Sequence, residues 1–276
     1  MTAAVRRRAR RLVALSDIHA DGEALRVALV GSGLCEETAV GLVWSAAPGT
    51  VLVVVGDFID GPTGAIGVWR VAAGLRRLEI AAAAAGSEVV VLLGNHETDL
   101  LGGAWSLCGG RPQLAASLGL SADGSPSQHP LGAWLATRPL VAIIGGCVLV
   151  HGGPTHAWEN WAQPFESFQA ALESLCAQHG LGHPLVGNGP ESILAAAAPR
   201  ALPAFATDGS LRQRFVAGWG GSGLLLVGHH AGIPGTPDLV PLDGGLRHGS
   251  RRVRVADVDL VSGRVSVVDL PLERAA

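Results

Sequence analysis

The sequence predicts an α/β fold, and three observations support this prediction. Short runs of valine, leucine and isoleucine recur along the chain, and longer segments between them have helical composition. With 276 residues and 48% hydrophobic content, the chain can bury a sizeable core. Strands that alternate with helices in this way are typical of a sheet covered by helices.

Five apolar runs are predicted to form buried strands, because each is short, rich in aliphatic residues and followed by glycine or a polar residue. These runs cover residues 12–15, 51–55, 89–93, 148–150 and 224–227. Helices are predicted between them, at residues 22–30, 66–85, 166–179 and 191–198.

The C-terminal part of the chain has a different pattern. Residues 252–258 and 264–270 alternate polar and apolar residues around Ser262-Gly263, which predicts a β-hairpin. Residues 121–130 and 234–251 are rich in glycine, proline, serine and aspartate, and both segments are predicted to be surface loops.

One domain is expected to span residues 1–276, because neither loop separates the motifs described below and the chain has no internal repeat. The arginine-rich residues 1–11 are expected to form a flexible basic extension. We do not expect an export signal, since the apolar stretch that follows covers only residues 12–15. No apolar run approaches the roughly 18 to 20 residues that span a bilayer, so a membrane partner is not expected.

Composition also limits the partners and the compartment. A formal net charge of -3 gives no overall attraction to nucleic acid or to an anionic membrane, so neither is expected as a partner. The four cysteines are too widely spaced for a zinc knuckle or a redox pair, and reduced thiols in the cytoplasm are the simplest interpretation. They are Cys35, Cys108, Cys147 and Cys176. The sequence carries no signal for an oligomeric state.

Aspartate, asparagine or histidine follows each of the five predicted strands. The segments are Asp17-Ile18-His19, Gly56-Asp57-Phe58-Ile59-Asp60-Gly61, Gly94-Asn95-His96-Glu97, His151-Gly152-Gly153 and Gly228-His229-His230. Sites form at the carboxyl ends of strands in open α/β sheets, because the loops converge there. The sequence therefore predicts that these polar side chains meet at one place.

The residue types point to metal binding. Asp17 and His19 are two positions apart, so in extended backbone both side chains face the same way and can bind one ion, and Asp57 can supply a second carboxylate. Oxygen ligands mixed with imidazole suit manganese, iron or zinc, whereas an all-oxygen set favours magnesium or calcium. The motifs contain no cysteine, which argues against a structural zinc site.

The five motifs, in this order over residues 12–230, resemble the signatures of the calcineurin-like metallophosphoesterases. The resemblance is greatest to the phosphoprotein phosphatase branch, and within it to the bacterial Shewanella-like phosphatases and their diadenosine tetraphosphatase relatives. It implies a β-sandwich of mixed sheets flanked by helices, with the active site at the strand carboxyl ends. It also implies a dinuclear centre of two divalent metal ions, manganese, iron or zinc.

Carried over by position, the resemblance implies a role for each polar residue. One ion is held by Asp17, His19 and Asp57, and Asp57 bridges to a second ion that is held by Asn95, His151 and His229. A water shared by two such ions is the nucleophile. His96 is the general acid that protonates the leaving oxygen, Asp60 orients the His96 ring, and Glu97 supports the site as a hydrogen-bond acceptor.

The sequence departs from the family pattern at several places, among them Ala20-Asp21, where Gly-Asp or Gly-Asn is common. Gly61-Pro62 follows Asp60, where relatives carry an arginine whose planar fork binds phosphate oxygens. Three arginines are candidates for the missing role: Arg111, Arg138 and Arg200. His230 stands where threonine or serine is common, so it is a candidate substrate contact and a competitor of His229 for the metal. Ser16 replaces the usual glycine.

The resemblance leaves three functions open. The first is a phosphomonoesterase that acts on a phosphorylated protein or a small phosphate ester. The second is a dinucleoside polyphosphate hydrolase or a nucleotide phosphodiesterase. The third is a catalytically inactive metal-binding regulatory protein, and the intact ligand set argues against it because clustered charged ligands gain nothing for a fold without metal.

Overall fold

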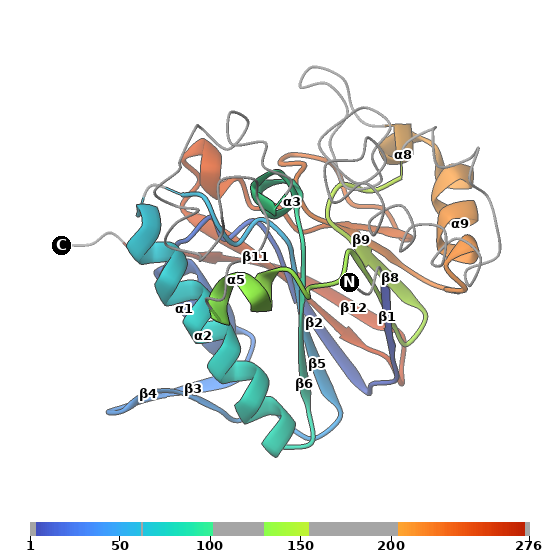
Figure 1. Ribbon diagram of the computed structural model, residues 1–276. Helices are drawn as coiled ribbons and strands as arrows, with labels where there is room; N and C mark the ends of the chain where they lie inside the picture. The colour runs from blue at the N-terminus through green and yellow to red at the C-terminus, as the bar shows by residue number, and fades with distance from the viewer. Residues whose placement is uncertain (1–3, 62, 102–129, 155–203, 274–276) are drawn as a thin grey trace.

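The computed structural model describes residues 4–61, 63–101, 130–154 and 204–273. Two five-stranded mixed sheets pack face to face, with helices on their outer sides (Figure 1). In spatial order, the first sheet consists of β1 (Ala4–Arg7), β7 (Val141–Ile144), β8 (Cys147–Val150), β9 (Leu225–Val227) and β10 (Leu239–Pro241). The second consists of β12 (Arg264–Pro271), β11 (Arg252–Asp259), β2 (Arg11–Leu15), β5 (Thr50–Val55) and β6 (Glu88–Leu92). This arrangement confirms the predicted fold class.

Apolar residues on the facing sides of the sheets form one core between them. Leu12, Val53 and Leu92 of the second sheet contact the same buried cluster as Leu149 and Leu226 of the first. The outer sides belong to a second apolar cluster, in which the helices take part. Because both faces of the central strands are covered, these strands are apolar almost throughout, which made them recognisable in the sequence.

The helices begin and end as follows: α1 (Gly22–Gly31), α2 (Gly64–Ala84), α3 (Asn95–Leu101), α5 (Pro130–Leu135), α8 (Ala204–Thr207) and α9 (Gly209–Gly218). Helices α1 and α2 cover the second sheet, and α8 and α9 lie on the side of the first (Figure 1). The side chain of Asp21 caps α1 by accepting hydrogen bonds from the backbone N–H groups of Glu23 and Ala24, as expected at a helix start. A separate hairpin joins β3 (Cys35–Thr38) to β4 (Gly41–Trp44).

The five predicted strands and the C-terminal hairpin are confirmed, and so are the predicted helices at 22–30 and 66–85, to within two residues. The predicted helices at 166–179 and 191–198, and residues 121–129 of one predicted loop, lie outside the described residues. Pro130 begins α5. In the part of the chain that the structure describes, no helix combines the length and the apolar character that crossing a membrane requires.

The prediction of a surface loop at 234–251 is wrong for part of the segment. It contains β10, with Leu239 and Val240 buried, and the 3-10 helix η2 (Leu246–His248). Its glycine and proline content obscured a three-residue strand. Pro241 is tolerated in that strand because β10 lies at the edge of its sheet, where a missing N–H is least costly.

The basic segment 1–11 also differs from expectation. Instead of a flexible extension, Ala4–Arg7 forms β1, which pairs in parallel with β7, and Arg11 begins β2. Arg7 forms an ion pair with Glu88 at 2.7 Å. Two apolar residues followed by arginines did not indicate a strand, and the strand that pairs with them lies more than 130 residues away in the sequence.

Candidate metal centre

The ends of strands from both sheets meet at one edge of the sandwich. In the second sheet β2, β5 and β6 are parallel, and in the first sheet β8 and β9 are parallel, so their carboxyl ends point the same way within each sheet. The side chains that follow these strands are buried although they are polar: Asp17, His19, Asp57, Asp60, Asn95, His96, Glu97 and His151. Sequence reasoning therefore predicted correctly which residues come together.

Four potential ligand atoms converge beside His151. Its Nε2 lies 3.2 Å from Asp57 Oδ2, 3.1 Å from Asn95 Oδ1 and 3.3 Å from His229 Nδ1. Ligand atoms about 2.1 Å from one ion are separated by about 3.0 to 3.4 Å at tetrahedral or octahedral angles. These four residues are the ones that the resemblance assigned to the second ion. The distances to His151 match the spacing of ligands on one cation, whereas His229 Nδ1 and Asn95 Oδ1 lie closer together, at 2.6 Å.

A second group of potential ligand atoms shares Asp57 with the first. Donor atoms of His19, Asp57 and His96 lie within 4.8 Å of one another. Asp17 Oδ1 is 3.7 Å from His19 Nε2, so this carboxylate lies beside the same group. Asp57 is common to both groups, which is the position that a bridging carboxylate would occupy.

Hydrogen bonds orient the imidazole rings toward the centre. His151 Nδ1 donates to the Val55 carbonyl at 2.8 Å, and His19 Nδ1 donates to the Asp60 carbonyl at 3.2 Å. In each ring this places a proton on Nδ1, so Nε2 can act as a ligand once it has lost its own proton. His229 differs, since it turns Nδ1 toward the centre while its backbone N–H donates to Asp17 Oδ2 at 2.8 Å.

Backbone strain is concentrated at the same place. Among the described non-glycine residues, φ is positive only at Asp17, His19, Ala20, Asp57, Asp60 and His229. A left-handed conformation costs an L-residue roughly 1 to 2 kcal/mol, so it persists only where the surroundings enforce it. Here it turns the chain sharply after β2, β5 and β9 and directs the side chains into the site.

Glycines in the motifs allow close approach between the turns. A Cβ at Gly94 would lie 2.2 Å from Asp57 Oδ1, and one at Gly228 would lie 2.1 Å from Ser16 Oγ. The Ser16 hydroxyl donates to the Val55 carbonyl at 2.6 Å. The serine that replaces the usual glycine therefore ties β2 to β5 without disturbing the site.

Glu97 holds the loops together rather than acting as a ligand. Its Oε2 accepts hydrogen bonds from the N–H groups of Asp57 and Gly94, and its Oε1 accepts from those of Phe58 and Ile59, at 2.7–3.0 Å. It is completely buried. Burial and the nearby Asp57 raise the pKa of Glu97 to about 7, against the opposing effect of the N–H groups.

His96 is held by a carboxylate that belongs to neither metal group. Its Nδ1 lies 2.9 Å from Asp60 Oδ2, and its Nε2 lies 3.7 Å from Asp57 Oδ2. The Nε2 atom also contacts Nη1 of Arg247, which reaches the site from η2. The carboxylate thus fixes the ring with Nε2 directed into the centre.

The electrostatics favour cations. Burial and the neighbouring Asp243 raise the pKa of Asp17 well above its usual value, so negative charges crowd this corner. Burial alone would raise the pKa of Asp57 as well, but His151 and His96 hold it well below the usual value. Burial opposes protonation of His151, yet the carboxylates of Asp57 and Asp17 raise its pKa to about 10. Divalent ions would neutralise this excess of buried carboxylate.

Two residues near the site were missed by sequence reasoning, because both lie in the segment interpreted as a surface loop. Asp243 is buried near Asp17, and its Oδ1 accepts a hydrogen bond from the Gly245 N–H at 2.7 Å. Arg247 contacts His96. The only sequence signal was their position a short distance after the fifth motif.

The substrate-binding candidates have different outcomes. Arg111 and Arg200 lie outside the described residues. Arg138 is wrong as a candidate, since it pairs with Glu79 at 2.5 Å and its guanidinium lies over the Trp134 ring, beside β1 and β6. His230 lies outside both ligand groups, because its Nε2 donates to the Gly152 carbonyl at 2.9 Å.

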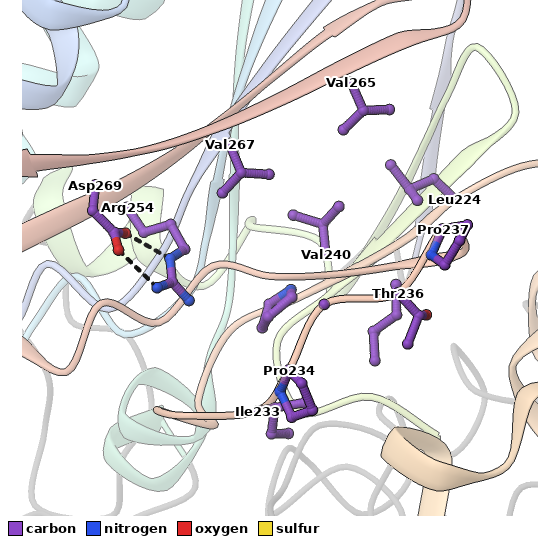
Figure 2. A pocket seen from close by; sticks show the side chains of 13 residues that line it. Leu224, Ile233, Pro234, Thr236, Pro237, Val240, Arg254, Val265, Val267 and Asp269 are labelled. Atoms are coloured by element: carbon purple, nitrogen blue, oxygen red, sulfur yellow. Dashed lines mark hydrogen bonds and ion pairs between the residues drawn. The ribbon is translucent and has the colours of Figure 1, made fainter.

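A cavity of about 530 Å³ lies away from the ligand groups, between residues 233–241 and the edge strand β12 (Figure 2). Its walls are mainly apolar, and an ion pair between Arg254 and Asp269 closes one end. None of the candidate metal ligands lines it.

Comparison with known proteins agrees with this geometry. The sequence profile described as calcineurin-like phosphoesterase matches residues 10–185, more than half of the chain. A search of curated proteins finds no significant match.

Solved structures of similar fold include a cold-active protein-tyrosine phosphatase of a psychrophilic Shewanella species, with a TM-score of 0.70 and 18% identity over 99% of this chain and 83% of that one. Another structure of a cold-active protein tyrosine phosphatase has a TM-score of 0.68 and 20% identity over 97% and 80%. A point mutant of such a phosphatase has a TM-score of 0.71 and 18% identity over 99% and 83%. At these identities the likeness shows the fold.

Replacing Glu97 with glutamine is expected to lower the free energy of unfolding by about 3 kcal/mol. The side-chain NH2 of glutamine would face backbone N–H groups and leave these buried donors without an acceptor. Denaturant unfolding of metal-free protein measures this loss without any contribution from the metal. Glu36→Gln, the same change at an exposed position of β3, is the control. Equal stabilities of the two variants would contradict the role assigned to Glu97.

Adding Mn²⁺ to metal-free protein is expected to raise Tm by roughly 5 to 10 °C, since ligand at about 100 times Kd contributes about 2.7 kcal/mol per site. Asp57→Asn should lose most of this shift because Asp57 serves both groups, whereas His229→Ala should lose part of it. His248→Ala, at an exposed position, should keep it. An unchanged shift in Asp57→Asn would show that the ions bind elsewhere.

Proposed function

This chain belongs to the calcineurin-like phosphoesterase family, and from this membership and the geometry of its site we propose that it is a dinuclear metal-dependent phosphomonoesterase. The observation that carries the proposal is the position of Asp57 in both groups of converging donor atoms. As a phosphoric ester hydrolase it would use Asp17, His19 and Asp57 for one ion, and Asp57, Asn95, His151 and His229 for the other. We propose that residues 1–276 act as one catalytic domain.

The mixture of nitrogen and oxygen donors favours manganese, iron or zinc as the two ions. When bound, such a pair supplies an activated water and stabilises charge on the attacking and leaving oxygens. The side chains of this protein perform the remaining tasks. They place the phosphorus beside the pair, exclude bulk water from a buried corner and deliver a proton to the leaving group.

His96 is proposed as the proton donor. Asp60 Oδ2 accepts a hydrogen bond from Nδ1, so the ring is orientated with Nε2 toward the centre, and the same carboxylate favours a proton on that ring. Transfer of the Nε2 proton to the leaving oxygen would turn an alkoxide or phenolate into a neutral alcohol or phenol. Asp60 acts through His96 and is a positioning residue.

The substrate is proposed to be a phosphorylated protein or a small phosphate ester. The similar structures are those of protein tyrosine phosphatases, which makes phosphotyrosine and aryl phosphates the first compounds to examine. A dinucleoside polyphosphate or a nucleotide diester is the second candidate, and competition between a phosphotyrosine peptide and a dinucleotide separates the two. We propose a cytoplasmic location and neither a nucleic-acid nor a membrane partner.

Replacing His96 with asparagine is expected to lower kcat by about 100-fold or more with an alkyl phosphate, in the range typical of a lost general acid. The loss should be much smaller with an aryl phosphate whose phenol has a low pKa, because such a leaving group needs little protonation. Steady-state kinetics of metal-loaded protein with both esters measure the difference, and His248→Asn is the matched control.

Metal content distinguishes the proton donor from a ligand, since His96 also lies in the donor group that contains His19 and Asp57. The His96→Asn variant should retain two ions per chain, while Asp57→Asn should lose metal together with activity. Loss of one ion from His96→Asn would assign this ring to the metal instead. Absence of turnover of every ester by metal-loaded wild type would favour the regulatory alternative.

A further inference from the structure

A phosphate monoester brings about two negative charges to the site, and the position that provides a cation in relatives cannot do so here. A Cβ at Gly61 would lie 1.6 Å from the His19 carbonyl oxygen, so the backbone leaves no room for a side chain directly after Asp60. The sequence contains no lysine, so the non-histidine cation that replaces the missing group must be another arginine.

We infer that Arg247 is the phosphate-binding residue of this site, an inference that rests on the proposed hydrolase function. Among the described residues it is the arginine whose guanidinium contacts a candidate catalytic side chain, His96. Burial lowers the pKa of His19, and the charge of Arg247 adds to this effect, which indicates that the guanidinium lies near His19 as well as His96. Arg247 as a whole is exposed, so an incoming ester can reach it.

The loop that carries Arg247 is built to hold it over the site. Asp243 accepts from the Gly245 N–H at 2.7 Å, which anchors the beginning of the loop beside Asp17. Positive φ angles at Gly245 (79°) and Gly249 (85°) begin and end the 3-10 turn η2. The Ser250 N–H donates to the Gly245 carbonyl at 3.0 Å and closes the loop. Arg247 therefore projects from a tight, closed turn.

The contact between Arg247 and His96 indicates how the site would change when substrate binds. The guanidinium of Arg247 donates to Nε2 of His96, the same atom that must face the leaving oxygen. Phosphate oxygens are stronger acceptors for a guanidinium than an imidazole nitrogen, and they fit its planar fork in a bidentate manner. Arg247 would therefore move from His96 to the phosphate on binding. Nε2, which only accepts in the contact with Arg247, would then take up from solvent the proton that it delivers to the leaving oxygen.

Other described arginines near this edge already have partners. Arg254 forms a two-bond pair with Asp269, at 2.6 and 2.9 Å. Arg138 pairs with Glu79 beside β1 and β6. Arg247 has no carboxylate partner among the ion pairs of the described residues. Movement of its side chain to a bound phosphate would therefore break no ion pair among these residues.

The test compares Arg247→Ala and Arg247→Lys with Arg251→Ala. Arg251 lies four residues away, is exposed and contacts the Glu273 carbonyl, so its loss changes the net charge equally without touching the site. In Arg247→Ala, kcat/KM for an aryl phosphate should fall roughly 10- to 100-fold, as expected for a lost charge-assisted hydrogen bond. Arg247→Lys should recover only part of the lost kcat/KM, because lysine lacks the planar fork of arginine. Arg251→Ala should have the kcat/KM of wild type.

Inorganic phosphate provides a readout that does not depend on turnover. Calorimetric titration of metal-loaded protein should show the Kd for phosphate weakened by a similar factor in Arg247→Ala, with metal content and Tm unchanged. Added guanidinium ion should restore part of the activity of this variant and should leave the activity of Arg251→Ala unchanged. Together these results would identify a binding role rather than a structural one.

The inference would be overturned if Arg247→Ala bound phosphate as wild type does, or if its kcat rose because the contact with His96 merely blocks the acid. Either outcome is distinct from failure of the proposed function, in which wild type itself hydrolyses no ester. If Arg247→Ala unfolded, Arg247→Gln with the same phosphate titration would decide.

Discussion

The carboxylate of Glu97 receives four backbone N–H groups, from Asp57, Phe58, Ile59 and Gly94, and the rest of the site depends on that convergence. These bonds join the turn after β5 to the beginning of α3, so the carboxylate of Asp57 is held against Gly94 and the donors that follow it. Asp57 is the one residue common to both donor groups. A buried acceptor for backbone groups thus positions the atom that two cations would share.

Strain and charge at the centre reinforce one another. The left-handed turns at Asp17, Asp57 and His229 direct side chains inward, and the buried carboxylates there repel each other, as the raised pKa of Asp17 indicates. Both costs are of the kind found where function rather than stability selects the residues. The apolar core between the sheets and the hydrogen bonds that the Val55 carbonyl and the Glu97 carboxylate accept supply the compensation.

The sandwich also explains how a chain without the usual arginine after Asp60 retains a cation at the site. Gly61 packs directly on the His19 carbonyl, so this position has room for glycine and none for a larger residue. The segment after β10 returns to the same edge and places Arg247 beside His96. Arg247 and His96, which are 151 residues apart in the sequence, thus come into contact.

The sequence by itself determined the strands and the polar residues that follow them, because short apolar runs ending in Asp, Asn or His are local patterns. It could not indicate β1, whose strand character depends on pairing with β7, or β10, whose glycine- and proline-rich surroundings look like a loop. Which nitrogen of each histidine faces the centre depends on carbonyls supplied by distant residues, such as Val55 for His151. Only the tertiary structure decided that Asp243 and Arg247 belong to the site and Arg138 does not, since proximity between distant segments is created by packing of the two sheets.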